Sequence, residues 1–308
     1  MKDMKALMNE WRSYEKKVLN EKANPAEVDP NRFPKGLSQV DAETAKTVTK
    51  TGPDNVDQGS EDDVIPVNTS GKWRAKDLKP SQNSMNLGKA AWFALGMANG
   101  TMFGSGGPGG QLGAFVSSDN YMMDGHHRWA ATSMIKPEAP IAGYAVDFPG
   151  KELVRILNTI TKGLLGVNQG KAGKGSFKSF RDINAVTQTL ANLAKDEQDN
   201  GKGKAFTGVA GAMTPGKALE VMEAETGQKG DAAVKAMAKI MVANVGKVPG
   251  MSDSAVMPGA SARPDMPVID DQDGPVQPAS KIAIKAMTTG QIDVNPPYGK
   301  SGAPQEEK

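Results

Sequence analysis

The chain has 308 residues, with 37 Lys and Arg against 35 Asp and Glu, 5% aromatic residues, 35 glycines and 20 prolines. The near balance of charge excludes a global field that would draw the whole chain to nucleic acid or to an anionic membrane, so any such binding needs a local patch. No cysteine and no run of 18 apolar residues occurs, which excludes disulfides, thiolate zinc sites and thiol nucleophiles, and we expect a cytoplasmic protein with no membrane partner.

Residues 1–22 predict an amphipathic helix, because apolar residues such as Leu7, Trp11 and Val18 recur at helical spacing among charged ones. Residues 23–60 are polar, contain four prolines and show no sustained period, so they predict a linker. The helix is then either a strap on the main domain or a docking element for a protein partner.

A small mixed α/β unit is predicted over residues 61–165. In chain order, we expect a strand at 63–68, a helix near 87–98, a glycine-rich loop without regular structure at 104–113, a β-hairpin around 118–120, a helix at 126–135, a strand at 141–148 and a helix at 151–165. The helix that begins at His126 has to stop before Pro137, because proline excludes the helical conformation of the residue before it.

Residues 166–248 predict a basic loop followed by a small α-helical region. The loop covers 166–180, and helical patterns cover 180–197, 214–226 and 231–245. We expect Pro215 in the first turn of the second helix and Asp231 as the N-cap of the third. Residues 249–308 form a Pro/Gly-rich tail, expected to be mostly extended or disordered. The predicted fold class is therefore α+β, a small mixed domain followed by helices, with long disordered or extended termini.

Both histidines of the chain stand in the sequence Asp124-Gly125-His126-His127-Arg128, where a strand is expected to end and a helix to begin. Unpaired N–H groups at the start of a helix favour an anion such as phosphate. The guanidinium of Arg128 and a histidine imidazole add donors that suit phosphate oxygens. This combination indicates recognition of a polyphosphate.

The carboxylate of Asp124 needs a separate explanation, because it repels phosphate. It could bind the N–H groups of its own turn, hold a histidine, or carry the Mg²⁺ that accompanies a nucleotide. A plain structural turn explains the same residues without any ligand. A metal site of His126 and His127 is disfavoured, because adjacent residues at a helix start point about 100° apart and the chain has no other histidine and no cysteine.

Residues 64–148 resemble the ParB/sulfiredoxin superfamily in four features that occur in order: the strand VIPV, the segment LKPSQN, a lysine in NLGKAAW, and a glycine-rich insertion before a hairpin that ends in DGHHRWAA. The motif is also similar to that of ParB-like free serine kinases. The resemblance implies that Gly125 forms the turn, that His127 and Arg128 contact the phosphates, that Lys89 reaches the nucleotide, and that Lys79 is the basic residue before the proline. The nucleotide would be ATP or CTP, with Mg²⁺.

The chain also departs from this family. His126 stands where sulfiredoxin has its reactive cysteine, which excludes a sulfinic acid reductase, and Trp92 and Gly96 stand where small hydroxyl residues face the nucleotide. The serine kinases use a glutamate as general base, and Glu61 and Glu138 are the only glutamates between residues 61 and 148. Residues 1–17 and 262–270 are similar to proteins of marine tailed phages that carry this domain, which would place the protein in the host cytoplasm or on the virion.

Three functions stay open at this point. The first is a nucleotide-binding protein, with phosphohydrolase or phosphotransfer activity if His126 or Asp124 orients the attacking group. The second is an inactive interaction or virion-associated protein. The third is non-specific DNA binding or cleavage through the basic run of residues 162–181, namely Lys162, Lys171, Lys174, Lys178 and Arg181.

Overall fold

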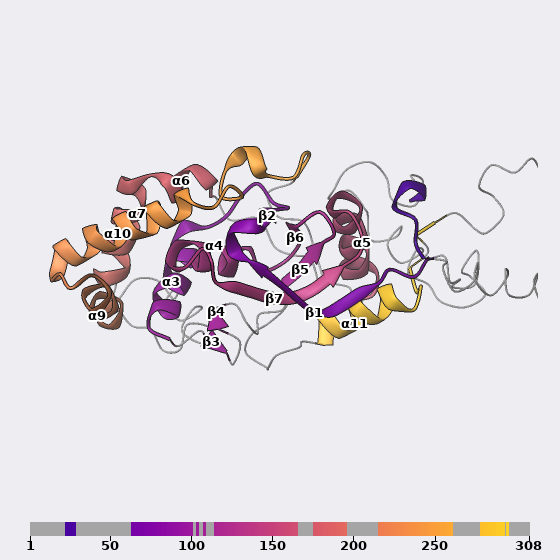
Figure 1. The fold of residues 1–308 in the computed structure, drawn as a ribbon, viewed down its shortest axis with the longest axis horizontal. Helices are drawn as coiled ribbons and strands as arrows, with labels where there is room; N and C mark the ends of the chain where they lie inside the picture. The colour runs from indigo at the N-terminus through magenta and orange to yellow at the C-terminus, as the bar shows by residue number, and fades with distance from the viewer. Residues whose placement is uncertain are drawn as a thin grey trace, which may run out of the picture.

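The fold is built on a five-stranded mixed β-sheet surrounded by helices (Figure 1). The computed structural model describes residues 22–28, 63–100, 103–104, 107–108, 114–165, 175–195, 215–260, 278–292 and 294–295. Over these ranges there are eight α-helices and one five-stranded sheet, so the predicted mixture of helices and strands is confirmed. None of these helices combines the length and the hydropathy needed to cross a bilayer.

The five strands lie in the order β1, β7, β5, β6, β2. Their bounds are Val67–Arg74 for β1, Pro140–Val146 for β7, Ala114–Ser117 for β5, Tyr121–Met122 for β6 and Lys79–Pro80 for β2. The pairs β1–β7 and β5–β6 are antiparallel, whereas β5–β7 and β2–β6 are parallel. The predicted hairpin is confirmed as β5–β6, and its turn is held by Asp119, whose carboxylate accepts the hydroxyl of Ser117 at 2.6 Å and the N–H of Gly150 at 2.8 Å.

Successive side chains of the central strands enter two different hydrophobic cores, as the period of two in a strand requires. In β5, Ala114 and Val116 belong to the first core, and Phe115 belongs to the second. The helices α3 (Leu87–Ala98) and α4 (His126–Ile135) contribute to the first core. The helices α5 (Gly150–Gly163) and α11 (Pro278–Thr288) contribute to the second, and Figure 1 shows the two groups toward opposite ends of the molecule.

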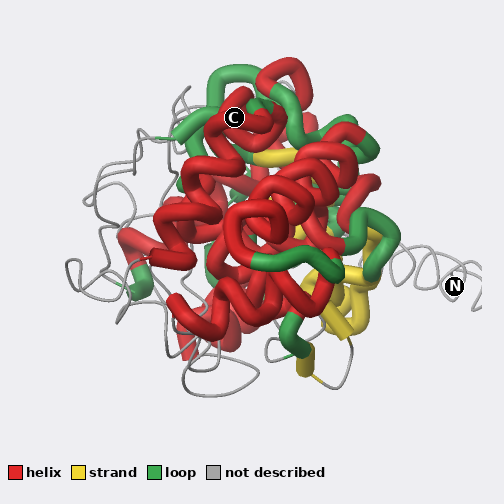
Figure 2. Tube along the Cα trace, turned by 90° about the vertical axis from the view of Figure 1, so that its left-hand side faces the viewer, coloured by secondary structure: helices red, strands yellow, loops and turns green. Residues whose placement is uncertain are grey.

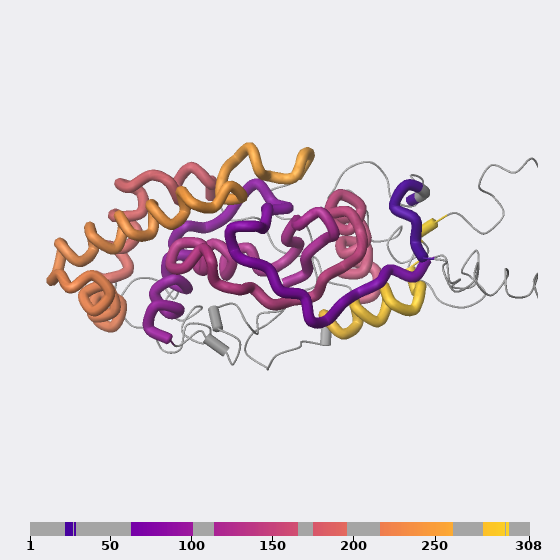
Figure 3. Tube along the Cα trace, in the orientation of Figure 1, coloured from indigo at the N-terminus to yellow at the C-terminus, as the bar shows by residue number. Residues whose placement is uncertain are grey.

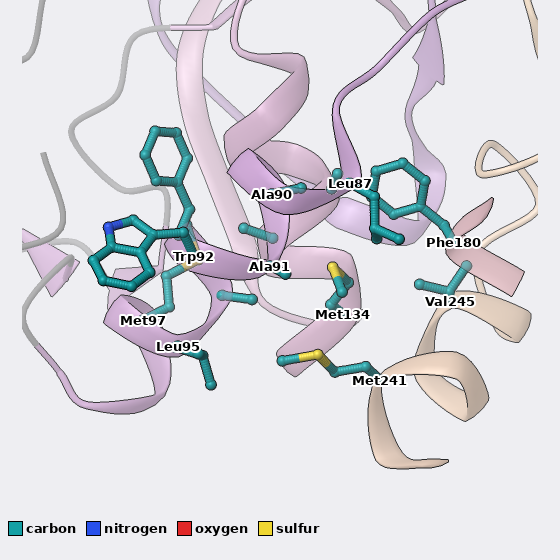
Figure 4. Close-up of a cluster of buried hydrophobic side chains, with 14 of the residues drawn as sticks. Leu87, Ala90, Ala91, Trp92, Leu95, Met97, Met134, Phe180, Met241 and Val245 are labelled. Carbon is teal, nitrogen blue, oxygen red and sulfur yellow. The ribbon is translucent and has the colours of Figure 1, made fainter. Parts of the chain in front are cut away.

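Four further helices pack against α3 and α4 and complete the first core. They are α6 (Phe177–Arg181), α7 (Ile183–Lys195), α9 (Pro215–Thr226) and α10 (Gly230–Gly246), and Figure 2 shows this helical layer in front of the strands. In Figure 4, Met241 and Val245 of α10 point toward Met134 of α4 and toward α3. The helical region and the α/β unit therefore share one core, which links α10 directly to the helix that carries both histidines.

Local signals predicted the central elements well. The helices α3, α4 and α5 and the strand β7 are confirmed within two residues of their expected bounds. The helix α4 ends at Ile135, directly before Lys136-Pro137. Pro215 opens α9 as expected.

Two strand predictions were wrong. The opening strand, expected at 63–68, runs instead from Val67 to Arg74. The carbonyl of Pro66 still accepts from Asp147, directly after β7, but the N–H of Ile65 donates away from β7, to Met287. The glycine-rich segment 104–113, expected to lack regular structure, contains the short strand β4 (Gly107–Pro108), which pairs antiparallel with β3 (Phe103–Gly104).

Two helix starts differ from expectation. The N-cap of α10 is Lys229 and not Asp231, because the carboxylate of Glu223 accepts both the N–H of Gly230 and the ammonium of Lys229, and so fixes the turn earlier. The basic loop predicted at 166–180 contains the start of α6, which the hydroxyl of Ser176 caps by accepting the N–H of Lys178. Residues 166–174 lie outside the described ranges.

The tail prediction for 249–308 was wrong in two places. Residues Asp253–Ala255 form a 3-10 helix, and Pro278–Thr288 form α11, whose Ala283 and Met287 are fully buried in the second core. The apolar residues Ile282 and Ile284 belong to this helix. The predicted helix at 1–22 lies outside the described residues except for Lys22, and of the predicted linker only 23–28 is described, with a 3-10 helix at Pro25–Glu27.

Three segments far apart in the sequence close the second core. We call them the terminal clasp: residues 23–24, residues 63–65, and the described part of 287–295 (287–292 and 294–295), which lie side by side at the right of Figure 3. The carboxylate of the buried Asp63 accepts the N–H groups of Val294 and Asn295 at 2.6 and 2.8 Å. The side chain of Asn295 also accepts the N–H of Asn24 and donates to its carbonyl.

Replacement of Asp63 by alanine tests the clasp. We expect Asp63→Ala to lower the free energy of unfolding by about 2–4 kcal/mol, because two backbone N–H groups lose their acceptor away from water. Asp77→Ala is the matched control, since Asp77 pairs with Arg74 on the surface, where such pairs contribute at most about 1 kcal/mol. Urea unfolding measures both variants, and equal losses would contradict the role of Asp63.

Candidate functional site

Gly125 forms the corner between β6 and α4. Its backbone has a φ of 91°, in the left-handed region that favours glycine. As the N-cap of α4, its carbonyl accepts the N–H groups of Arg128 at 3.0 Å and Trp129 at 2.9 Å. The helix therefore starts at His126, and the side chains of both histidines leave its first turn.

His126 is a buried acceptor. The backbone N–H of Ser81 donates to its Nε2 at 3.1 Å, and the residue is 4% exposed. Because an N–H can only donate, Nε2 carries the lone pair and the single ring proton lies on Nδ1. Burial lowers the pKa of His126 to about 3 from its ordinary 6.5. This imidazole is therefore neutral at physiological pH.

His127 makes an equivalent contact at the other end of the connection between β2 and α3. Its Nε2 accepts the backbone N–H of Asn86 at 3.3 Å. Asn86 is the N-cap of α3, and its side chain accepts the N–H of Lys89 at 2.8 Å. Two adjacent residues at a helix start point in different directions, so the two imidazoles reach Ser81 and Asn86, the two ends of the connection between β2 and α3.

Arg128 and Asp124 lie next to each other. The guanidinium Nη2 of Arg128 is 3.7 Å from the Oδ2 of Asp124, and the arginine side chain is only 8% exposed. Asp124 therefore offsets part of the positive charge at the corner. Within the described ranges, no group of three or more His, Cys, Asp or Glu side chains comes together in a way that could hold a metal ion.

The two predicted lysines stand on different elements, and each lies over an aromatic ring. The Nζ of Lys89, in the first turn of α3, is 5.4 Å from the centre of the Phe93 ring. The Nζ of Lys79, on the edge strand β2, is 4.0 Å from the centre of the Tyr121 ring. Lys89 is thus placed at the start of the helix that His127 contacts.

The N-termini of three helices meet around Asn86. The contact with His127 joins α4 to α3, and Gly175 packs so closely on Met85 that a Cβ at Gly175 would overlap the Met85 carbonyl, which brings the start of α6 alongside. None of these three described helices has an acidic residue in its first turn. A shallow, open depression lies at this junction, lined by Asn86, Leu87, Gly88, Gly175, Ser176 and Ser179.

Sequence reasoning missed the lining of this depression. Asn86 and Ser176 carry the usual N-cap signal, a short polar residue directly before a helix. That signal locates helix starts, but it does not say that two starts lie side by side. Trp92, which stands where a nucleotide-facing residue was expected, is buried in the first core (Figure 4).

The basic run at 162–181 is only partly described. Lys178 is exposed and lies 4.0 Å from the carboxylate of Asp253. Arg181 donates to the backbone carbonyls of Met251 and Val248 at 3.0 and 3.3 Å, so its guanidinium anchors a neighbouring segment. Lys171 and Lys174 lie outside the described residues.

Comparison of the chain with protein-family models, with curated proteins and with solved structures found no match.

The burial of His126 predicts a pH-dependent stability. Because its folded pKa of about 3 lies below the ordinary 6.5, the unfolded chain takes up this proton first, so the contribution is complete above pH 6.5 and declines as the pH falls toward 3. The slope for one such group is at most about 1.4 kcal/mol per pH unit. We expect urea unfolding between pH 7.5 and 5.0 to show this decline in the wild type.

His126→Gln is the comparison, since its amide oxygen can still accept the N–H of Ser81 but does not titrate. The variant should show a clearly flatter profile over the same pH range. Identical slopes for the two proteins would refute the assignment.

Proposed function

We propose that this protein binds the phosphate groups of a nucleoside triphosphate, ATP or CTP, at the junction of α3, α4 and α6. The observation that carries the proposal is the meeting of three helix N-termini around Asn86, none with an acidic residue in its first turn. The aligned peptide dipoles of the helices favour negative charge at such a point.

Side chains at the junction add to this preference. Lys89 stands in the first turn of α3, and Arg128 stands in the first turn of α4. Gly88 lines the depression without a side chain, which allows a ligand to approach the backbone closely. Ser176 adds a hydroxyl group whose oxygen accepts the N–H of Lys178, whereas the hydroxyl of Ser179 donates to the Ser176 carbonyl at 2.6 Å. This set of donors suits phosphate oxygens.

The resemblance of residues 64–148 to the ParB/sulfiredoxin superfamily also supports this ligand, since the residues that it implies for phosphate contact are His127, Arg128 and Lys89. Asp124 is the carboxylate of the motif, and it would hold any Mg²⁺ that enters with the nucleotide, after exchanging its contact with Arg128. The proposal is limited to binding. The Nε2 lone pair of His126 is engaged by Ser81 and the pKa of this residue is low, which makes it a poor base.

A charge placed in the depression provides the first test. Isothermal calorimetry with tripolyphosphate, ATP and CTP, with and without Mg²⁺, should detect binding to the wild-type protein. Ser179→Glu should weaken it at least about tenfold, or 1.4 kcal/mol, by placing a carboxylate beside the anion. Ser179→Gln has nearly the same shape without the charge and should stay close to wild type. Absence of binding, or equal affinity of the two variants, would refute the site.

The second test concerns Lys89. Lys89→Ala should lower the affinity for tripolyphosphate by about three- to tenfold, because one cation of the junction is lost. Lys235→Ala is the matched control, since Lys235 is exposed on α10 and outside the depression. A similar decrease in the two variants would indicate only a general effect of net charge.

A further inference from the structure

The contact between Asn86 and His127 lies at the edge of the depression, since Asn86 lines it. In this contact the backbone N–H of Asn86 points at the unprotonated Nε2 of His127, 3.3 Å away. The N–H is thereby occupied, and the Nε2 presents a lone pair. A phosphate oxygen is itself only an acceptor, so it cannot bond to His127 Nε2 in this state.

Protonation of Nε2 of His127 removes the acceptor from this contact. When Nε2 is protonated, two N–H donors face each other at 3.3 Å and repel, so the imidazole ring has to turn away and leaves a place that an acceptor can occupy. An anionic oxygen is such an acceptor, and it would receive a bond from the backbone of Asn86 and a charge-assisted bond from His127. The proton comes from solvent and remains on the imidazole, so no covalent bond to the ligand forms or breaks.

We propose that anion binding at this junction is coupled to the uptake of one proton by His127, which turns from an acceptor of the Asn86 N–H into a donor to the ligand. This inference rests on the proposed function, since it describes the same site. It also separates the roles of the two histidines. His126 holds Ser81 in the interior at 4% exposure, whereas His127 is less buried and stands beside the depression.

The surrounding charges favour this coupling. Titratable groups on the elements packed around the contact are Asp124 in the turn, Arg128 on α4, Lys89 on α3, Lys79 on β2, Tyr121 on β6, Lys178 on α6 and Asp253 in the segment after α10. The two carboxylates lie near cations, Asp124 near Arg128 and Asp253 near Lys178. A bound polyanion places negative charge beside the imidazole and so favours its charged form. Ligand and proton therefore stabilise each other, as linkage requires.

Calorimetry in two buffers tests the coupling. Tripolyphosphate is titrated into the full-length protein at pH 7.5 in Tris and in HEPES, which differ in ionisation enthalpy, so the difference in observed heat gives the number of protons taken up. We expect the wild type to take up about one proton more than His127→Gln, whose amide can accept from Asn86 and can also turn to donate to an anion without protonation.

The same measurement on His126→Gln is the control, and it should give the proton count of the wild type. The affinity of the wild type should also rise relative to that of His127→Gln as the pH falls from 8 to 6. Binding with equal proton counts for the wild type and His127→Gln would overturn the coupling and leave the proposed function standing. No binding to the wild type in either buffer would overturn the proposed function itself.

Discussion

Two hydrogen bonds from the backbone of residues 81–86 to adjacent imidazoles join the connection between β2 and α3 to the first turn of α4. The N–H groups of Ser81 and Asn86 lie at the two ends of this connection, and each has a histidine Nε2 as its acceptor. The donor of Ser81 is buried, and without its acceptor it would remain unpaired at a cost of about 1–3 kcal/mol. The only two histidines of the chain are thus explained first by structure: they fix the start of α3 against the start of α4.

These two hydrogen bonds lie within a fold in which a hydrophobic core packs against each face of the central sheet. The central strands send alternate side chains into two cores, so the glycine corner at Gly125 is held by packing from both directions. The indole N–H of Trp129, one turn into α4, donates to the carbonyl of Ala75 at 2.7 Å and ties the helix to the sheet connection. On the opposite face, the terminal clasp closes the second core around Asp63. A junction of helix starts on such a scaffold can present its N–H groups in a fixed direction, which is what selective anion binding requires.

The same geometry limits the chemistry that the junction can perform. A catalytic base needs an available lone pair and a pKa near the working pH, and His126 meets neither condition because it is buried against Ser81. Asp124 has Arg128 beside it. The cations, the helix dipoles and the hydroxyl group of Ser176 suit the holding of negative charge. Our proposal is therefore one of binding, with a proton as the proposed coupled species.

The sequence by itself determined the elements whose signals are local: α3 and α4, the β5–β6 hairpin, and the corner at Gly125, since a helix start, a proline stop and a tight turn depend on residues a few positions apart. It also indicated the candidate residues of the motif. Only the tertiary structure decided which partners they meet, because those contacts join residues such as Ser81 and His126, 45 positions apart.

The helix α11 and the terminal clasp at Asp63 were not predicted from the sequence, because they too depend on contacts between residues far apart in the chain. A short apolar stretch in a Pro/Gly-rich tail becomes a stable helix only when the second core covers its apolar face. The carboxylate of Asp63 accepts its backbone N–H groups only when Val294, 231 positions away in the sequence, lies beside it.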